Sequence, residues 1–302
     1  MLRLYRDNPE LPVELPDEAI LYAMRSEEIG RTLALHFDEA TVGLGLKLIG
    51  RLGRAHDPRY RRVYLELADS VLEAVIRHRP REFRQVALRL IRRTLSLEAD
   101  IVVPGEAYLL ARIVHHHGLL LSQLGSYESA MARYEDADAR AMDLGEFASG
   151  DEIGAEWALV RIHHSAAMHL SGESDRAREL AREVDELTAR TQAATYARIK
   201  LAEHCIVRDD IAGAADLLRS MVEGNVAGYE QPSLVNRTIA LKDWAIVQAH
   251  GGDRTAAVKS AVAGLAMAKE LGFRDQEEKM ITRLGEVGIS PAELRIDRAE
   301  PG

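Results

Sequence analysis

Apolar side chains recur every three or four residues along almost the whole chain, which is the spacing of one face of an α-helix. The stripe between residues 63 and 78 consists of Val63, Leu67, Val71, Leu72 and Val75. The next stripe consists of Phe83, Val86, Leu90 and Leu97. No stretch alternates as a strand does, and residues 100–105, which come nearest, are too short to found a sheet. The pattern predicts an all-α fold with about 12 to 14 helices of ordinary length, arranged in antiparallel pairs.

Proline and glycine positions divide the chain into regions. Three prolines within residues 1–16 disfavour a helix there, so this segment is predicted to be an extended arm. Asp17 is a suitable N-cap for the first helix of an N-terminal helical region, 17–105. Residues 106–290 are predicted to hold helical repeats that end in a capping helix around Met280 and Leu284, and residues 291–302 to form a tail.

Four of the breaks between helices resemble one another, because each places a turn residue five positions before an alanine. These alanines are Ala130, Ala177, Ala215 and Ala257, spaced 47, 38 and 42 residues apart. Two helices joined by a tight turn need a small side chain where they cross closely, and alanine provides it. Helix–turn–helix units at this period are typical of an α-solenoid, in which each unit covers the apolar face of its neighbour.

The spacing within these units resembles that of the tetratricopeptide repeat family. In residues 111–144 the matching positions are Gly118, Gly125, Ala130, Tyr134 and Ala137. In residues 158–191 they are Ser165, Gly172, Ala177 and Ala181. Residues 196–229 depart from the pattern, because Glu203 stands where a small residue is expected. In residues 238–271 Gly264 closes the pattern. The Trp of the first helix and the closing Pro that are usual in the family are absent. The resemblance implies a right-handed superhelix of antiparallel helix pairs. Two units of the chain close with the segments "MDLG" and "KELG". In this feature the repeats are similar to the sensor arrays of bacterial transcriptional regulators.

Composition and charge narrow the classes of function. Hydrophobic residues make up 47% of the 302 residues, aromatics only 5%, and the net charge of −9 argues against bulk attraction to nucleic acid. Residues 51–93 run against this trend with twelve arginines and five acidic residues. This basic segment is either a solvated helix face or a contact for phosphates or an acidic partner. A single cysteine, Cys205, and the lack of a long apolar run favour a cytoplasmic protein with no membrane span.

Cations and histidines gather on the predicted first helices of the repeats, which in the resembled family line a concave groove. The candidate ligand-groove residues are Arg112, His116, Gln123, His163, His169, Lys200, His204, Arg208 and Lys242, with His250 beside them. One interpretation is a groove for an anionic group, such as a peptide carboxylate or acidic side chains. The other is that these side chains form hydrogen bonds between helices and hold no ligand.

The sequence contains no motif for catalysis or for a cofactor. A metal site is not expected either, because neighbouring histidines such as His163 and His164 diverge by about 100° on a helix and so cannot converge on one ion. The sequence therefore predicts a non-catalytic scaffold or regulatory module that binds a protein or a peptide. The expected partner is an acidic protein or peptide. The alternative is a small-molecule sensor or enzyme with a pocket between the N-terminal helices and the repeats. A weaker alternative is nucleic-acid binding through residues 51–93. An incompletely capped last repeat would favour a homodimer.

Overall fold

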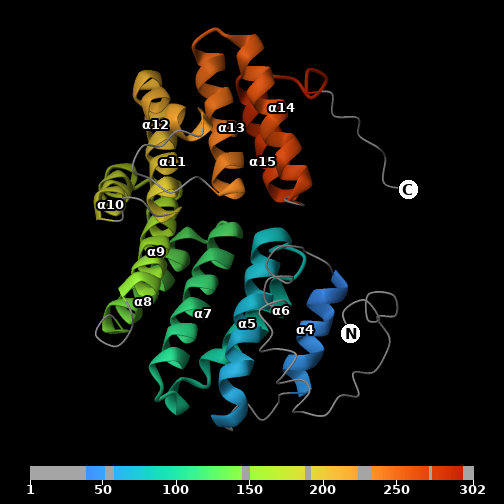
Figure 1. Cartoon of the computed structure of the whole chain (residues 1–302), viewed down its shortest axis with the longest axis vertical. Helices are drawn as coiled ribbons and strands as arrows, with labels where there is room; N and C mark the ends of the chain where they lie inside the picture. The colour runs from blue at the N-terminus through green and yellow to red at the C-terminus, as the bar shows by residue number, and fades with distance from the viewer. Residues whose placement is uncertain are drawn as a thin grey trace. The chain divides into compact units, whose positions relative to one another are not determined.

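The computed structural model describes residues 39–51, 58–144, 150–187, 192–223, 233–271 and 274–294, which are helical and contain no strand (Figure 1). The all-α prediction is confirmed for these residues. The α-helices are α4 (Glu39–Arg51), α5 (Pro58–His78), α6 (Arg84–Leu95), α7 (Pro104–Gln123), α8 (Tyr127–Leu144), α9 (Gly150–Ser171), α10 (Ser174–Leu187), α11 (Gln192–Val207), α12 (Ile211–Glu223), α13 (Leu234–His250), α14 (Arg254–Glu270) and α15 (Arg274–Glu286). A short 3-10 helix, Glu98–Asp100, begins just before the nearest strand candidate.

Some predictions fall outside the described residues. These are the extended arm 1–16, the helix that Asp17 would begin, and the tail beyond residue 294. Among the helices that the structure describes, none combines the length and the hydropathy needed to cross a membrane.

The chain divides into two compact units, Met1–Ala167 and Met168–Gly302, and the division falls within α9. Near the predicted division at residue 105, α7 begins at Pro104 and packs against both α5 and α6. We call the two units the N-terminal unit and the C-terminal unit and describe each by itself.

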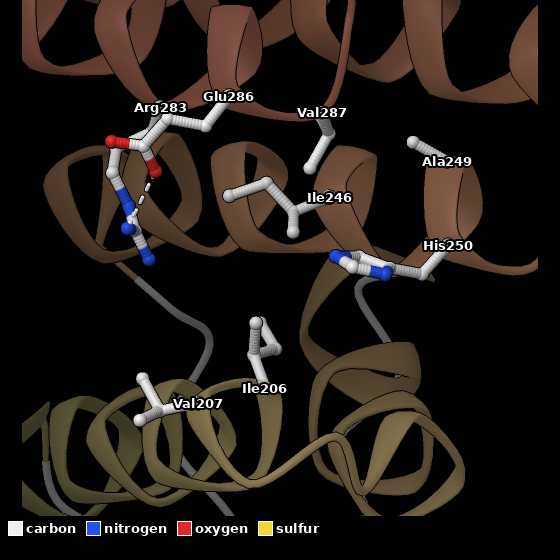
Figure 2. A pocket seen from close by; sticks show the side chains of 8 residues that line it. All are labelled: Ile206, Val207, Ile246, Ala249, His250, Arg283, Glu286 and Val287. Atoms are coloured by element: carbon white, nitrogen blue, oxygen red, sulfur yellow. Dashed lines mark hydrogen bonds and ion pairs between the residues drawn. The ribbon is translucent and has the colours of Figure 1, made fainter.

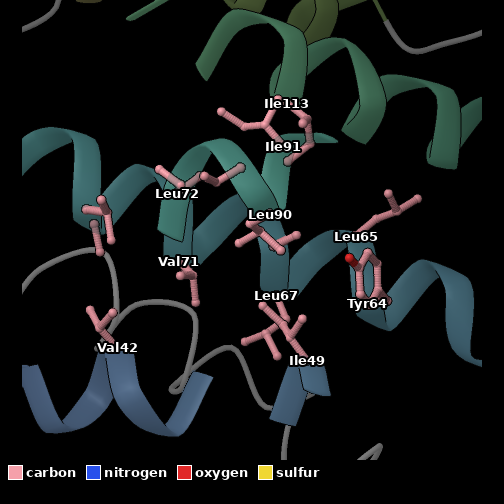
Figure 3. Close-up of a cluster of buried hydrophobic side chains, with 14 of the residues drawn as sticks. Val42, Ile49, Tyr64, Leu65, Leu67, Val71, Leu72, Leu90, Ile91 and Ile113 are labelled. Atoms are coloured by element: carbon pink, nitrogen blue, oxygen red, sulfur yellow. The ribbon is translucent and has the colours of Figure 1, made fainter. Parts of the chain in front are cut away.

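The core of the N-terminal unit lies between α4, α5, α6 and α7, with Val42, Leu67, Leu72, Ile91 and Ile113 among its buried side chains (Figure 3). The whole predicted stripe of α5 is buried. In the following stripe Leu90 and Leu97 are buried as predicted, but the helix turns a different face to the core than Phe83 and Val86 indicated. Its buried residues are Ala87, Leu90, Ile91 and Thr94, while Phe83 and Val86 are half-buried. Phe83 precedes the helix, and Thr94 can be buried because its hydroxyl donates to the Leu90 carbonyl at 2.9 Å.

In the C-terminal unit each helix from α10 to α15 packs on the next, and α13 also packs on both α11 and α15. The predicted capping segment forms α15, whose Met280 and Leu284 are buried with Ile289, which follows the helix. Figure 1 shows α13, α14 and α15 lying side by side.

Four helix–helix turns share one backbone geometry. The residues with positive φ are Gly125 (79°), Gly172 (100°), Asp209 (62°) and Gly252 (81°). The residue after each donates its N–H to the carbonyl five positions earlier, as Ser126 does to Leu121 at 2.9 Å, which closes a Schellman-type helix end. Five positions after each left-handed residue stands a fully buried alanine: Ala130, Ala177, Ala214 and Ala257.

One of the predicted alanines is therefore off by one position. Ala215 is half-buried, and Ala214 occupies the helix crossing in its place. The reason is that Asp209, and not Asp210, adopts the left-handed conformation, which Asp tolerates better than most residues with a side chain. Asp210 instead caps α12, because its Oδ1 accepts a hydrogen bond from the Gly213 N–H at 2.9 Å.

Candidate functional site

Eight of the nine candidate ligand residues lie on helices of the structure. Arg112, His116 and Gln123 belong to α7, His163 and His169 to α9, Lys200 and His204 to α11, and Lys242 to α13; Arg208 follows α11. Gln123 is half-buried at the last position of α7. The geometry of the other eight decides how much of their charge is available to a ligand.

Arg112 is held by acidic side chains from the neighbouring helices. Its Nε donates to Asp69 Oδ1 at 3.0 Å, and its Nη1 donates to Glu156 Oε2 at 3.3 Å. Glu73 lies 3.7 Å from the same guanidinium. Burial alone would lower the pKa of Arg112, but the charges of Asp69 and Glu156 raise it above its ordinary value. This guanidinium is thus paired within the chain across α5, α7 and α9.

The histidines beside Arg112 extend this network. His115 Nδ1 lies 2.6 Å from Glu156 Oε1, and its Nε2 lies 2.8 Å from His163 Nδ1. His116 Nε2 lies 2.9 Å from Asp69 Oδ1. Burial would raise the pKa of both carboxyls, but the hydrogen bonds from the histidines and the nearby charges lower the pKa of Asp69 and that of Glu156 to about 2. Both are therefore ionised at neutral pH and tie three helices together.

This cluster brings two histidines together without forming a metal site. Both ring nitrogens of His115 already contact Glu156 and His163. In the part of the chain that the structure describes, no group of three His, Cys, Asp or Glu side chains is arranged to hold a metal ion.

A second charged cluster joins α11 to α13. Lys200 Nζ lies 2.7 Å from Glu203 Oε2, and Lys242 Nζ lies 3.1 Å from Glu203 Oε1 and from Asp243 Oδ1. Burial would lower the pKa of both lysines, but these acids raise it. Burial raises the pKa of Asp243 to about 7. Glu203, at the position where the resembled family has a small residue, is thus the acid that both lysines share.

His169 and His204 pack edge to face, with ring centroids 4.3 Å apart. His169 Nδ1 also lies 3.2 Å from the Ser174 hydroxyl. Burial, and after it the neighbouring His169, lower the pKa of His204 to about 4, and burial also lowers the pKa of His169. Both rings therefore favour the neutral form. Arg208, the most exposed of the candidates, pairs with Asp175.

A cavity in the C-terminal unit lies where three helices end, and it has a volume of about 490 Å³. Figure 2 shows Ile206 and Val207 of α11 pointing toward Ile246 of α13 and Val287 after α15. Ala249, His250, Arg283 and Glu286 complete the lining. We call this cavity the α11–α13–α15 pocket.

The polar groups of this pocket differ in how they are engaged. Arg283 Nη1 donates to Glu286 Oε2 at 2.7 Å. The ring of His250, the last residue of α13, has no hydrogen-bond or ion-pair partner among the described residues. Val207 is 58% exposed although it is a valine at the pocket wall. The pocket thus offers apolar surface, one unengaged imidazole and one guanidinium–carboxylate pair.

A second cavity of about 470 Å³ lies in the N-terminal unit, beside the start of α7 and the end of α8. Its wall includes the exposed Val102 and Val103, and Arg140 lies 2.8 Å from Glu98 next to it. Here the one guanidinium is again paired by an acid of the chain.

Comparison with protein-family models, curated proteins and solved structures finds no match to this chain. The resemblance to tetratricopeptide repeats therefore depends on the residues of this chain alone.

Sequence reasoning identified the cations and histidines but missed their acidic partners. Asp69 stands 43 positions before Arg112, and Glu156 stands 44 positions after it. Such partners meet only through the register between neighbouring helices. The pocket was also missed, apart from His250; the available signal was the apolar pair Ile206–Val207 directly before a predicted turn.

Proposed function

We propose that this chain is a non-catalytic peptide-binding module and that its ligand occupies the α11–α13–α15 pocket. The observation that carries the proposal is the convergence of eight side chains from three helix ends on a cavity of about 490 Å³ with an unengaged imidazole. Concave, mostly apolar cavities with a few convergent polar groups are the usual form of a binding site.

We further propose that the helices form a right-handed, tetratricopeptide-like superhelix. The repeated turn geometry supports this, since four left-handed residues each precede a fully buried alanine by five positions. The packing of α13 on both α11 and α15 supports it as well, because in such a solenoid first helices contact first helices.

The chemistry of the ligand follows from which groups remain available. Arg112, Lys200 and Lys242 are neutralised by acids of the chain, so they offer little to an anion. The pocket retains His250, and Arg283 would have to exchange Glu286 for a ligand carboxylate. We therefore expect a peptide with an apolar side chain for the pocket and an adjacent acidic group or C-terminal carboxylate for His250.

A random peptide library with free C-termini, displayed and selected on the immobilised protein, tests this proposal. Val207→Glu would place a charge in the pocket wall without disturbing the core, because Val207 is exposed. Val262→Glu is the matched control, since Val262 is also an exposed valine but lies outside the pocket. Peptides enriched on the wild type should be retained by Val262→Glu and lost by Val207→Glu. Equal retention by both variants would place the peptide site elsewhere.

A small apolar molecule is the second candidate ligand, and the volume of the pocket favours it. Cavities of about 300–1,000 Å³ commonly hold small ligands. Native mass spectrometry of the protein incubated with a metabolite extract distinguishes the two, because a bound small molecule would appear as a fixed mass increase that Val207→Glu removes.

A further inference from the structure

Helix α6 carries four arginines and no acidic residue. All four arginines of its sequence, RQVALRLIRRTL, are exposed: Arg89, Arg92 and Arg93 lie away from its buried residues, and Arg84 lies in its first turn. We call these four side chains the basic face of α6. Arg81, in the preceding turn, is exposed as well. In a chain with a net charge of −9, this is a local concentration of positive charge.

The basic face is not neutralised by the rest of the described chain. Neither the four arginines nor Arg81 forms an ion pair with an acidic side chain that the structure describes, in contrast to Arg112, Lys200 and Lys242. The Arg93 guanidinium lies 5.5 Å from the centroid of the Tyr64 ring. The positive field also acts on a neighbour: burial lowers the pKa of His117, and Arg133 and Arg92 lower it further.

We propose that the basic face of α6 binds the phosphodiester backbone of a nucleic acid. Guanidinium groups match phosphate geometry and are the side chains that most often contact it. Arg84 and Arg93 are nine residues apart, so the face extends about 13.5 Å along the helix, enough to contact several successive phosphates. The face offers no array of base-reading side chains, so the binding is independent of sequence.

Two other occupants fit the face less well. A protein partner would need an apolar anchor at the centre of the interface, and none of the exposed large apolar side chains of the described residues lies on α6. A bilayer would need the apolar side of the helix, but Ala87, Leu90 and Ile91 are already buried in the core of the N-terminal unit (Figure 3). Phosphates spaced along a flexible or helical strand require only the guanidinium groups.

Fluorescence polarisation tests the proposal with three labelled probes of mixed sequence: duplex DNA, single-stranded DNA and single-stranded RNA. The full chain is titrated at salt concentrations between about 50 and 200 mM, over which phosphate contacts weaken steeply. The variant Arg84→Gln/Arg89→Gln/Arg92→Gln removes three charges. The control Arg182→Gln/Arg219→Gln/Arg237→Gln removes three exposed arginines of the C-terminal unit, so its net charge is the same.

The proposal expects the α6 variant to bind at least about tenfold more weakly at low salt, and the control to bind as the wild type does. The dependence of log affinity on log salt should become shallower by about 2.7 for the duplex and about 2 for single strands, as the loss of three contacts requires. Arg84→Lys/Arg89→Lys/Arg92→Lys should keep the wild-type slope, because the charges remain.

Equal affinities of the wild type and the α6 variant would overturn the proposal, as would the lack of wild-type binding to all three probes. Polyglutamate is added as an unlabelled competitor at the same concentration of negative charge as unlabelled nucleic acid. If it displaces the labelled probe equally well, the proposal is overturned and the face is assigned to an acidic protein. Which probe binds most tightly identifies the nucleic acid that the face prefers.

Discussion

Gly118 of α7 lies directly against the ring of Tyr134 in α8. A Cβ atom built on Gly118 would lie 2.7 Å from Tyr134 Cε1, closer than such atoms approach in proteins. Tyr134 is 1% exposed and its ring also packs near His115 and His163, so it has little room to move. Both residues occupy matched positions of the repeat pattern, and this contact gives the pattern a physical reason.

Gly118→Ala should therefore destabilise the protein. The added methyl overpacks the crossing by about 1–3 kcal/mol, which exceeds the gain in helix propensity of about 1 kcal/mol. Urea denaturation of Gly43→Ala is the control, because a Cβ on this helical glycine meets nothing within 4 Å and should stabilise the protein. A stability gain for both variants would show that the α7–α8 crossing is looser than described.

The register of the third turn can be tested with two adjacent alanines. Ala214→Leu should overpack the crossing and lower the free energy of unfolding by about 1–3 kcal/mol, as should Ala130→Leu and Ala177→Leu. Ala215→Leu should have a much smaller effect, because Ala215 is only half-buried. Thermal denaturation followed by circular dichroism measures both, and a larger loss for Ala215→Leu would restore the register read from the sequence.

Glu203→Gln should destabilise the C-terminal unit, because one carboxylate neutralises both Lys200 and Lys242. Removing one partner of a buried ion pair leaves an uncompensated charge, and a loss of about 2–3 kcal/mol is expected for this partly exposed cluster. Glu278→Gln, on the exposed side of α15, is the control. If the two variants unfold at the same denaturant concentration, the cluster contributes nothing to stability.

Acidification should destabilise the protein through His204. Its pKa is lowered to about 4 in the folded chain, while an unfolded histidine titrates near 6.5. Between these values the unfolded state binds more protons, so stability is lost as the pH falls from about 6.5 to about 4. In His204→Gln the free energy of unfolding should fall less over this range, by about 2 kcal/mol. Identical pH profiles for the two proteins would contradict this assignment.

The sequence was a good guide wherever local spacing decides the structure. Helical period determines which side of α5 is buried, and a glycine five positions before an alanine marks three of the four turns correctly. The fourth failed because two aspartates are adjacent, and only the backbone shows that Asp209 makes the turn while Asp210 caps the next helix.

The candidate site was harder to predict, because it depends on contacts between helices. The sequence indicated a row of cations, but which of them stay available depends on acids some 40 positions away, such as Asp69 for Arg112 and Glu203 for Lys242. The α11–α13–α15 pocket likewise depends on where three helices end together, which no single segment reveals.

Calorimetric titration of the most strongly selected peptide into the wild type, Val207→Glu and Val262→Glu tests the central claim most directly. Binding in the α11–α13–α15 pocket predicts that Val207→Glu lowers the affinity at least about tenfold, a loss of about 1.4 kcal/mol, while Val262→Glu binds as the wild type does. Equal affinities for all three proteins would contradict the claim that this pocket holds the ligand.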